Sequence, residues 1–215
     1  MRISVSCLGN IMGIESFWPK MGGVNNNMWY VIQTLKGQEY RVADYIRDIA
    51  KDGENIFVFE NEMEYRIKGE WIRDRKPFFP GYIFVEMEKG QAEDFNKRLY
   101  KKKRKLLSVD GDITPIKEEE EDYLRKLGGD EHIIHYSEGF RVDDMVVITS
   151  GAFKGYTGEI SKLDRHNRRA RIKVSLLGRD TEVEIGLEIV DNKTFRELSE
   201  EEKVDRLNAA RIVSA

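Results

Sequence analysis

Cysteine is almost absent from this chain of 215 residues, since Cys7 is the only one. A single cysteine excludes a disulfide framework and a thiolate metal cluster, and we expect a protein of the reducing cytoplasm. Long hydrophobic runs are missing too, because no stretch of about 18 apolar residues predicts a transmembrane helix. The first residues lack a clean cleavage site, so we expect neither a signal peptide nor membrane association.

Catalytic motifs are also lacking. The sequence has no Gly-x-x-x-x-Gly-Lys-Ser/Thr loop, no Gly-x-Ser-x-Gly turn and no His-Glu-x-x-His helix. His132 and His135 stand close together in an expected linker, but without a cysteine or a convincing carboxylate partner. We therefore expect no enzyme, no cofactor and no metal site. The net charge is only −3, so binding to nucleic acid would depend on a local basic patch.

Two patterns of residues divide the chain. After Met28, β-branched and aromatic runs alternate with amphipathic helical segments, which predicts an α+β layer with an antiparallel sheet and flanking helices. Beyond Gly128-Gly129 the pattern is almost entirely β up to Val190, which predicts a small barrel. The predicted parts are a tail over residues 1–27, a first domain over 28–128, a linker over 129–139, a second domain over 140–191 and a helical C-terminal tail over 192–215.

The first 27 residues differ from those that follow. A polar spacer, Val24-Asn25-Asn26-Asn27, precedes the strong strand pattern that begins at Met28. We expect either that residues 1–27 form a disordered tail or that Met28 is the natural start.

Glycines at fixed offsets mark the predicted barrel. Gly151, Gly155 and Gly158 lie in one short polar turn between strand-like runs. Glycine accepts a positive φ without steric cost, so this spacing predicts a demanding turn. Small barrels of this kind usually bind other macromolecules, and this favours a search for partners over a search for a catalytic pocket.

An aromatic motif, Phe78-Phe79-Pro80-Gly81-Tyr82, stands before a predicted strand. Its proline and glycine restrict the backbone, so the rings beside them point in defined directions. Such rings, together with Trp29 and Tyr30, either belong to the core or form a groove for a partner helix. The sequence leaves both interpretations open for each ring.

A basic run is the clearest charge feature of the chain. Its like charges repel one another, a cost that contacts with phosphate groups would relieve. The alternative is a solvated loop offset by the acidic run Glu118–Asp122. A second basic group, Lys162–Arg171, is either a solvated turn or a secondary nucleic-acid contact. The candidate nucleic-acid residues are Lys97, Arg98, Lys101, Lys102, Lys103, Arg104 and Lys105, extended by Lys36, Arg41 and Arg47.

These motifs, in this order, resemble the NusG-family transcription elongation factors. The resemblance spans residues 28–190 and implies an NGN domain followed by a KOW domain, an SH3-like barrel. It also implies that the NGN domain docks on the clamp helices of bacterial RNA polymerase and that the KOW domain binds a ribosomal protein or the termination factor Rho. The implied polymerase-binding residues are Tyr30, Phe78, Phe79, Pro80 and Tyr82, and the implied KOW partner residues are Phe153, Leu176, Leu177 and Arg179.

The basic run carries more positive charge than the corresponding segment of general family members. This departure is similar to LoaP-type antiterminators, which recognise an RNA hairpin, whereas RfaH-type paralogues read the non-template DNA strand and can refold their KOW domain into helices. We therefore expect a monomeric antitermination factor that favours an RNA hairpin over non-template DNA. The β-branched residues of the second domain predict a barrel without a helical alternative. The competing class is a KOW-containing ribosomal or structural protein that binds RNA but not polymerase.

Overall fold

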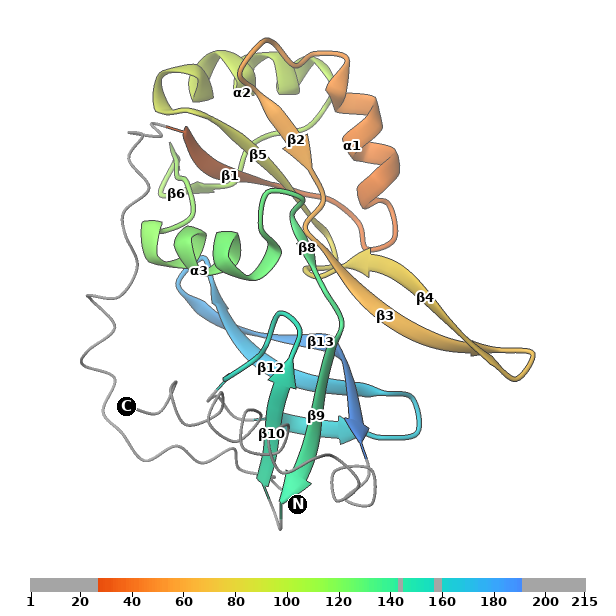
Figure 1. The fold of residues 1–215 in the computed structure, drawn as a ribbon. Coiled ribbons are helices and arrows are strands. Elements are labelled where there is room, and N and C mark those ends of the chain that lie inside the picture. The colour runs from red at the N-terminus through yellow and green to blue at the C-terminus, as the bar shows by residue number, and fades with distance from the viewer. Residues whose placement is uncertain (1–26, 143–144, 157–159, 191–215) are drawn as a thin grey trace.

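The computed structural model describes residues 27–142, 145–156 and 160–190 (Figure 1). The predictions for the two tails, and for Gly158 of the glycine-rich turn, fall outside the described residues. The described chain forms a helix-covered sheet, whose sequence is interrupted by a long hairpin, and then a barrel of strands.

A three-stranded antiparallel sheet is the centre of the first domain. Strands β1 (Asn27–Gln33), β5 (Tyr82–Glu88) and β2 (Asn55–Phe57) are hydrogen-bonded in that order. Successive side chains of a strand point to opposite faces of its sheet. On β1, Tyr30 belongs to one apolar cluster and Trp29 to another. Both faces of the sheet are therefore buried, and each requires a separate cover.

Helices α1 (Glu39–Arg47) and α2 (Ala92–Lys101) cover the first face of this sheet (Figure 1). Val42, Ala43 and Ile46 are buried along α1, and their spacing places them on one stripe of the helix. This stripe packs on the cluster that contains Tyr30, so the face is closed by segments of the same domain.

Helix α3 (Glu118–Gly128) contributes to the cover of the second face. Its Leu124 lies in the same apolar cluster as Trp29. Four consecutive glutamates, Glu118–Glu121, occupy its first turn, where negative charge suits the helix dipole. The short elements before α3 are η1 (Lys89–Gln91), β6 (Ser108–Val109) and β7 (Asp112–Ile113).

A long hairpin extends from the first domain (Figure 1). Its strands, β3 (Glu60–Ile67) and β4 (Glu70–Pro77), pair from Glu60↔Pro77 to Ile67↔Glu70. Strand β8 (Ile133–Ile134) pairs in parallel with the start of β3. The predicted linker over 129–139 thus carries β8 and the start of the next strand, and the domain limits stay predictions.

The second domain is a barrel of five strands in the order β10-β9-β13-β12-β11. The prediction of an α+β domain followed by a small all-β barrel is confirmed, and within 140–190 the described regular elements are all strands. Gly151 has a φ of +81°, and a Cβ there would lie 2.2 Å from the Tyr136 carbonyl oxygen, so glycine is required. The strands are β9 (Ser137–Val142), β10 (Met145–Ser150), β11 (Ile160–Asp164), β12 (Arg169–Leu176) and β13 (Arg179–Val190).

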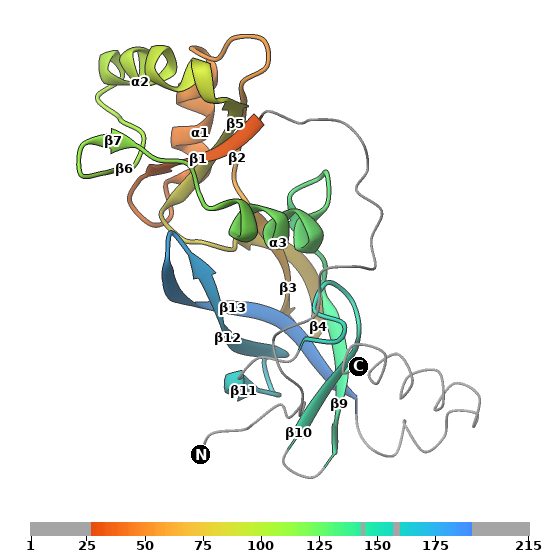
Figure 2. The same ribbon diagram turned by 90° about the vertical axis from the view of Figure 1, so that its left-hand side faces the viewer.

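The barrel lies against the second face of the first domain's sheet (Figure 2). One apolar cluster contains Trp29 and Phe84 of the sheet together with Phe153 and Leu176 of the barrel. Gly186 of β13 allows a close approach, because a Cβ there would lie 2.4 Å from the Glu62 carbonyl oxygen. The two domains therefore share a core in this structure.

Candidate binding surfaces

The predicted basic run forms the end of α2 and the loop that follows it. Leu106 pairs with Ile32 of β1 in an isolated bridge, and its N–H donates to the side-chain oxygen of Asn96 at 2.8 Å. Lys103 has a φ of +56°, which turns the chain sharply after the helix. The Lys102 ammonium lies 4.2 Å from the centre of the Tyr45 ring on α1. The loop is thus attached at both ends while most of its charge faces outward.

The exposed lysines of this loop carry free positive charge. Among the described residues, none forms an ion pair with Lys101, Lys103 or Lys105, and all three are exposed. A groove of about 560 Å³ runs between the loop and the end of β1, lined by Lys103, Arg104 and Lys105 on one side and Thr34 and Leu35 on the other. The cationic side chains that line this groove suit the phosphates of a nucleic acid, and its apolar side chains suit the bases.

Arg41 and Lys97 are exposed, and Arg41 lies one turn before Tyr45 on α1, so it extends the same surface. Lys36 is exposed as well, but it lines a different groove, of about 520 Å³, that runs between the two domains. Arg47 pairs with Asp44 and bonds the Ile56 carbonyl oxygen.

Arg98 has a structural role that the sequence did not suggest. Its side chain is 15% exposed, and its guanidinium donates to both carboxylate oxygens of Glu54, a side chain that is only 1% exposed. It also pairs with Asp94 and bonds the Ile49 carbonyl oxygen. We therefore leave Arg98 out of the candidate nucleic-acid surface.

The predicted polymerase-binding residues divide into buried and accessible ones. Tyr30, Phe78 and Phe79 are each 1% exposed, so the structure gives these three the core position that the sequence had left open. Tyr30 packs beneath α1 and α2, whereas Phe78 and Phe79 face the barrel side of the sheet. Pro80 is exposed and Tyr82 is half-buried.

The predicted KOW partner residues face the first domain. Phe153 and Leu176 are buried in the shared core, and the rings of Phe153 and Phe78 are 6.4 Å apart. Leu177 is half-buried, while the exposed Arg179 donates to the Tyr82 hydroxyl at 3.1 Å. Residues predicted to bind two different protein partners therefore lie against each other here.

Charged residues surround this shared core. Arg168 pairs with Glu64 of β3 at 2.6 Å and with Glu188 of β13 at 2.8 Å, and its guanidinium lies over the Trp71 ring. Burial alone would raise the pKa of Glu64, but hydrogen bonds from Arg168 and Arg73 outweigh it and leave that pKa below its usual value. Arg169 pairs with Glu184 of the barrel itself, and its guanidinium lies 4.8 Å from the centre of the Tyr65 ring on β3, so it too contacts the first domain.

Sequence reasoning missed Glu120, which joins α3 to the barrel. Its carboxylate accepts the backbone N–H groups of Leu177 and Gly178, each at 2.9 Å, and the Ser175 hydroxyl at 3.0 Å. Burial raises the pKa of Glu120, but these hydrogen bonds more than compensate and hold the pKa below its usual value. The only local signal was its position in the first turn of a helix. An acidic residue there is already explained by its favourable interaction with the helix dipole, so it did not indicate a contact with the barrel.

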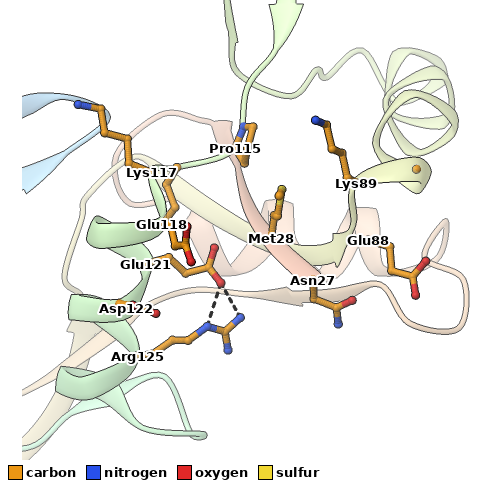
Figure 3. A pocket seen from close by; sticks show the side chains of 12 residues that line it. Asn27, Met28, Glu88, Lys89, Pro115, Lys117, Glu118, Glu121, Asp122 and Arg125 are labelled. Atoms are coloured by element: carbon orange, nitrogen blue, oxygen red, sulfur yellow. Dashed lines mark hydrogen bonds and ion pairs between the residues drawn. The ribbon is translucent and has the colours of Figure 1, made fainter. Parts of the chain in front are cut away.

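A further pocket, of about 810 Å³, opens between the start of β1 and α3 (Figure 3). Glu121 points toward Arg125 there, accepts its Nε–H at 2.9 Å and also accepts the Trp29 N–H at 3.0 Å. These central polar groups are therefore satisfied by one another. Outside the pocket, His132 stacks on Phe57, and His135 lies 3.3 Å from Glu62.

Two negative findings apply to the described residues only. They contain no group of three or more histidine, cysteine, aspartate or glutamate side chains arranged to hold a metal ion. Their helices are also too short or too polar to span a membrane.

Known proteins match both domains. The family model described as transcription termination factor nusG matches residues 27–125, and the KOW motif model matches residues 142–175. The transcription termination/antitermination protein NusG of Haemophilus influenzae is 28% identical over 75% of this chain and 92% of its own length. The protein of the same name from Thermus thermophilus is 27% identical over 73% of this chain and 94% of its own length.

A solved structure of Thermotoga maritima NusG covers 74% of this chain and 93% of its own, with 24% identity. Its TM-score of 0.43 is too low to support a comparison of domain arrangements. The chain is therefore similar to NusG-family proteins over both domains, because the two family models match it in order and the relatives align over about three quarters of its length.

Proposed function

We propose that this chain is a transcription elongation and antitermination factor that binds bacterial RNA polymerase and a nucleic-acid signal. Relatives named termination/antitermination proteins support the general role. The more specific part, a LoaP-type paralogue that recognises an RNA hairpin, rests on the basic loop, because the relatives carry the general NusG name. In this proposal the NGN domain anchors the protein on the polymerase clamp helices and the loop adds affinity where the signal occurs.

The observation that carries the nucleic-acid part is the contrast between two basic groups. Arg168 and Arg169 are neutralised by glutamates at the domain interface. Lys101, Lys103 and Lys105 are exposed and form no ion pair with a described residue. A phosphate backbone would relieve the mutual repulsion of these lysines and release counterions.

The test is to reverse the three exposed charges together, as Lys101→Glu, Lys103→Glu and Lys105→Glu. Affinity for transcript leader RNA and for the matching non-template DNA is measured side by side over a series of salt concentrations. If each lysine contacts one phosphate, the slope of log affinity against log salt falls by about 2 to 3 units. We expect the larger loss with the RNA and nearly unchanged binding to polymerase.

A matched control reverses three exposed lysines elsewhere, Lys68, Lys126 and Lys173, and so changes the net charge equally. It should retain the salt dependence of the unmodified protein, apart from a small general effect. Equal losses in both variants would mean that net charge alone governs binding, and the proposed role of the loop would then be wrong.

The protein-binding part of the proposal involves a conformational requirement. Pro80 and Tyr82 are accessible, but Phe78 and Phe79 are covered in the shared core. Docking on the clamp helices through all of these residues therefore requires the barrel to move away. The same movement would expose Phe153 and Leu176 for a ribosomal protein or Rho.

A further inference from the structure

The turn between β12 and β13 gathers hydrogen-bond donors around one carboxylate. The N–H of Leu177 donates to Oε2 of Glu120, and the N–H of Gly178 and the Ser175 hydroxyl donate to Oε1, at 2.9 to 3.0 Å. Figures 1 and 2 show this turn lying against α3. All four lone-pair directions of a carboxylate can accept such bonds, and charge-assisted hydrogen bonds are the strong ones.

The backbone of this two-residue hairpin turn is left-handed at both central positions, as a type I′ turn requires. Leu177 has a φ of +57° and Gly178 a φ of +72°, so two successive residues are in the left-handed region. Glycine accepts this conformation readily, but for a bulky residue such as leucine it is rare and costly. The conformation turns two adjacent N–H groups toward the same acceptor, and strained backbone of this kind is often found at binding sites.

The surroundings of the turn suit a protein ligand. Leu177 is half-buried beside the donors, Leu176 is buried in the shared core and would become accessible when the domains separate, and the exposed Arg179 adds a positive charge. These are residues that we expect to bind a partner of the KOW domain. A phosphate backbone would gain little from the leucines, whereas a peptide with an acidic residue between apolar ones would use both kinds of contact.

We propose that the Ser175–Gly178 turn is a binding site for a carboxylate side chain of a protein partner, which Glu120 occupies while the two domains are in contact. The partner segment presents a glutamate or aspartate flanked by apolar side chains. This inference rests on the proposed function in one respect, namely that the KOW domain recruits a protein. Release of Glu120 and capture of the partner are then competing events at the same donors.

The experiment uses the full chain carrying Glu120→Ala, a substitution that removes the carboxylate from the turn. The chain is labelled with ¹⁵N so that its amide resonances can be followed. The probes are the capped tripeptides Leu-Glu-Leu and Leu-Gln-Leu, which differ only in charge and one atom, and inorganic phosphate. We expect Leu-Glu-Leu to shift the amide resonances of Leu177 and Gly178 downfield and to bind at least about tenfold more tightly than either other probe. The unmodified chain should respond about tenfold more weakly, because Glu120 competes.

Two further variants separate binding from folding. Glu119→Ala removes an exposed carboxylate from the same helical turn and should behave as the unmodified chain does. Glu120→Gln removes the charge but keeps a side-chain oxygen that can accept the Lys117 N–H, as the capping box at the start of α3 requires. A peptide response in this variant therefore cannot be caused by unfolding of α3.

The proposal is overturned if neither amide responds to Leu-Glu-Leu in the vacated chain. Equal binding of Leu-Gln-Leu would show that charge is not recognised, and equal or tighter binding of phosphate would assign the turn to phosphate groups in place of a protein. No polymerase or nucleic acid is present in this experiment. Its failure can therefore be distinguished from a failure of the charge-reversal test of the basic loop.

Discussion

Phe79 and Tyr82 stand three residues apart in one motif but have different environments. Phe79 is 1% exposed, and its ring centre is 4.7 Å from that of Phe78 and 6.0 Å from that of Phe84. Tyr82 is half-buried and its hydroxyl accepts a hydrogen bond from Arg179. Residues of the same motif can therefore contribute to stability or to recognition, and substitutions should separate the two.

For Phe79→Ala we expect the free energy of unfolding to fall by about 3 to 5 kcal/mol, because a large ring leaves a cavity in the core. Tyr82→Phe removes only the hydroxyl and should cost about 1 kcal/mol or less. Urea denaturation of both variants measures these differences. A fully stable Phe79→Ala variant that loses polymerase binding would show that Phe79 acts at the surface instead.

At the scale of elements, α2 has two sides with different tasks. Arg98 on its inner side joins the helix to the turn before β2 through Glu54, which also accepts the Lys51 N–H at 2.8 Å. Lys97, the preceding residue, is exposed. The helix thus holds the basic loop in position through an ion pair while it presents other cations to the solvent.

We expect Arg98→Ala to lower the free energy of unfolding by about 3 to 5 kcal/mol, since it leaves Glu54 buried without its partner. Lys97→Ala should change stability by about 0.5 kcal/mol at most. In the nucleic-acid assay, Lys97→Ala should reduce the salt slope by about 0.7 to 0.9 units per lost phosphate contact. Should Arg98→Ala be stable and also lower the salt slope, Arg98 would return to the nucleic-acid surface.

At the scale of the whole molecule, the two domains cover each other's predicted partner surfaces. The contact combines an apolar centre with ion pairs such as Arg168–Glu64 and Lys76–Glu184. It depends on a close approach at Gly186, where β13 passes the backbone of Glu62. Because the obstacle there is a main-chain atom, a small side chain is enough to disturb the contact.

We expect Gly186→Ala to separate the domains, because its Cβ would lie 2.4 Å from the Glu62 carbonyl oxygen. Small-angle X-ray scattering should show a larger radius of gyration, and amide spectra should retain the dispersed resonances of a folded barrel. Gly90→Ala is the control, since a Cβ at Gly90 would have nothing within 4 Å. An unchanged radius of gyration for Gly186→Ala would contradict this account of the domain contact.

The sequence by itself determined the local elements and the exposed charge. β-Branched runs such as Met145–Ser150 form strands, and glycines such as Gly151 stand where φ must be positive, because these preferences act within a few residues. The basic loop was predictable for a similar reason, since so many unpaired cations in succession cannot be buried.

Only the tertiary structure decided what covers the second face of the sheet and what each charge pairs with. The alternation along β1 showed that both faces are apolar, but such a pattern does not name the segment that packs on them. Phe153 reaches Phe78, and Glu120 reaches the turn at Leu177, across more than fifty residues of chain. Contacts at such separations depend on how whole domains pack, and no local pattern records them.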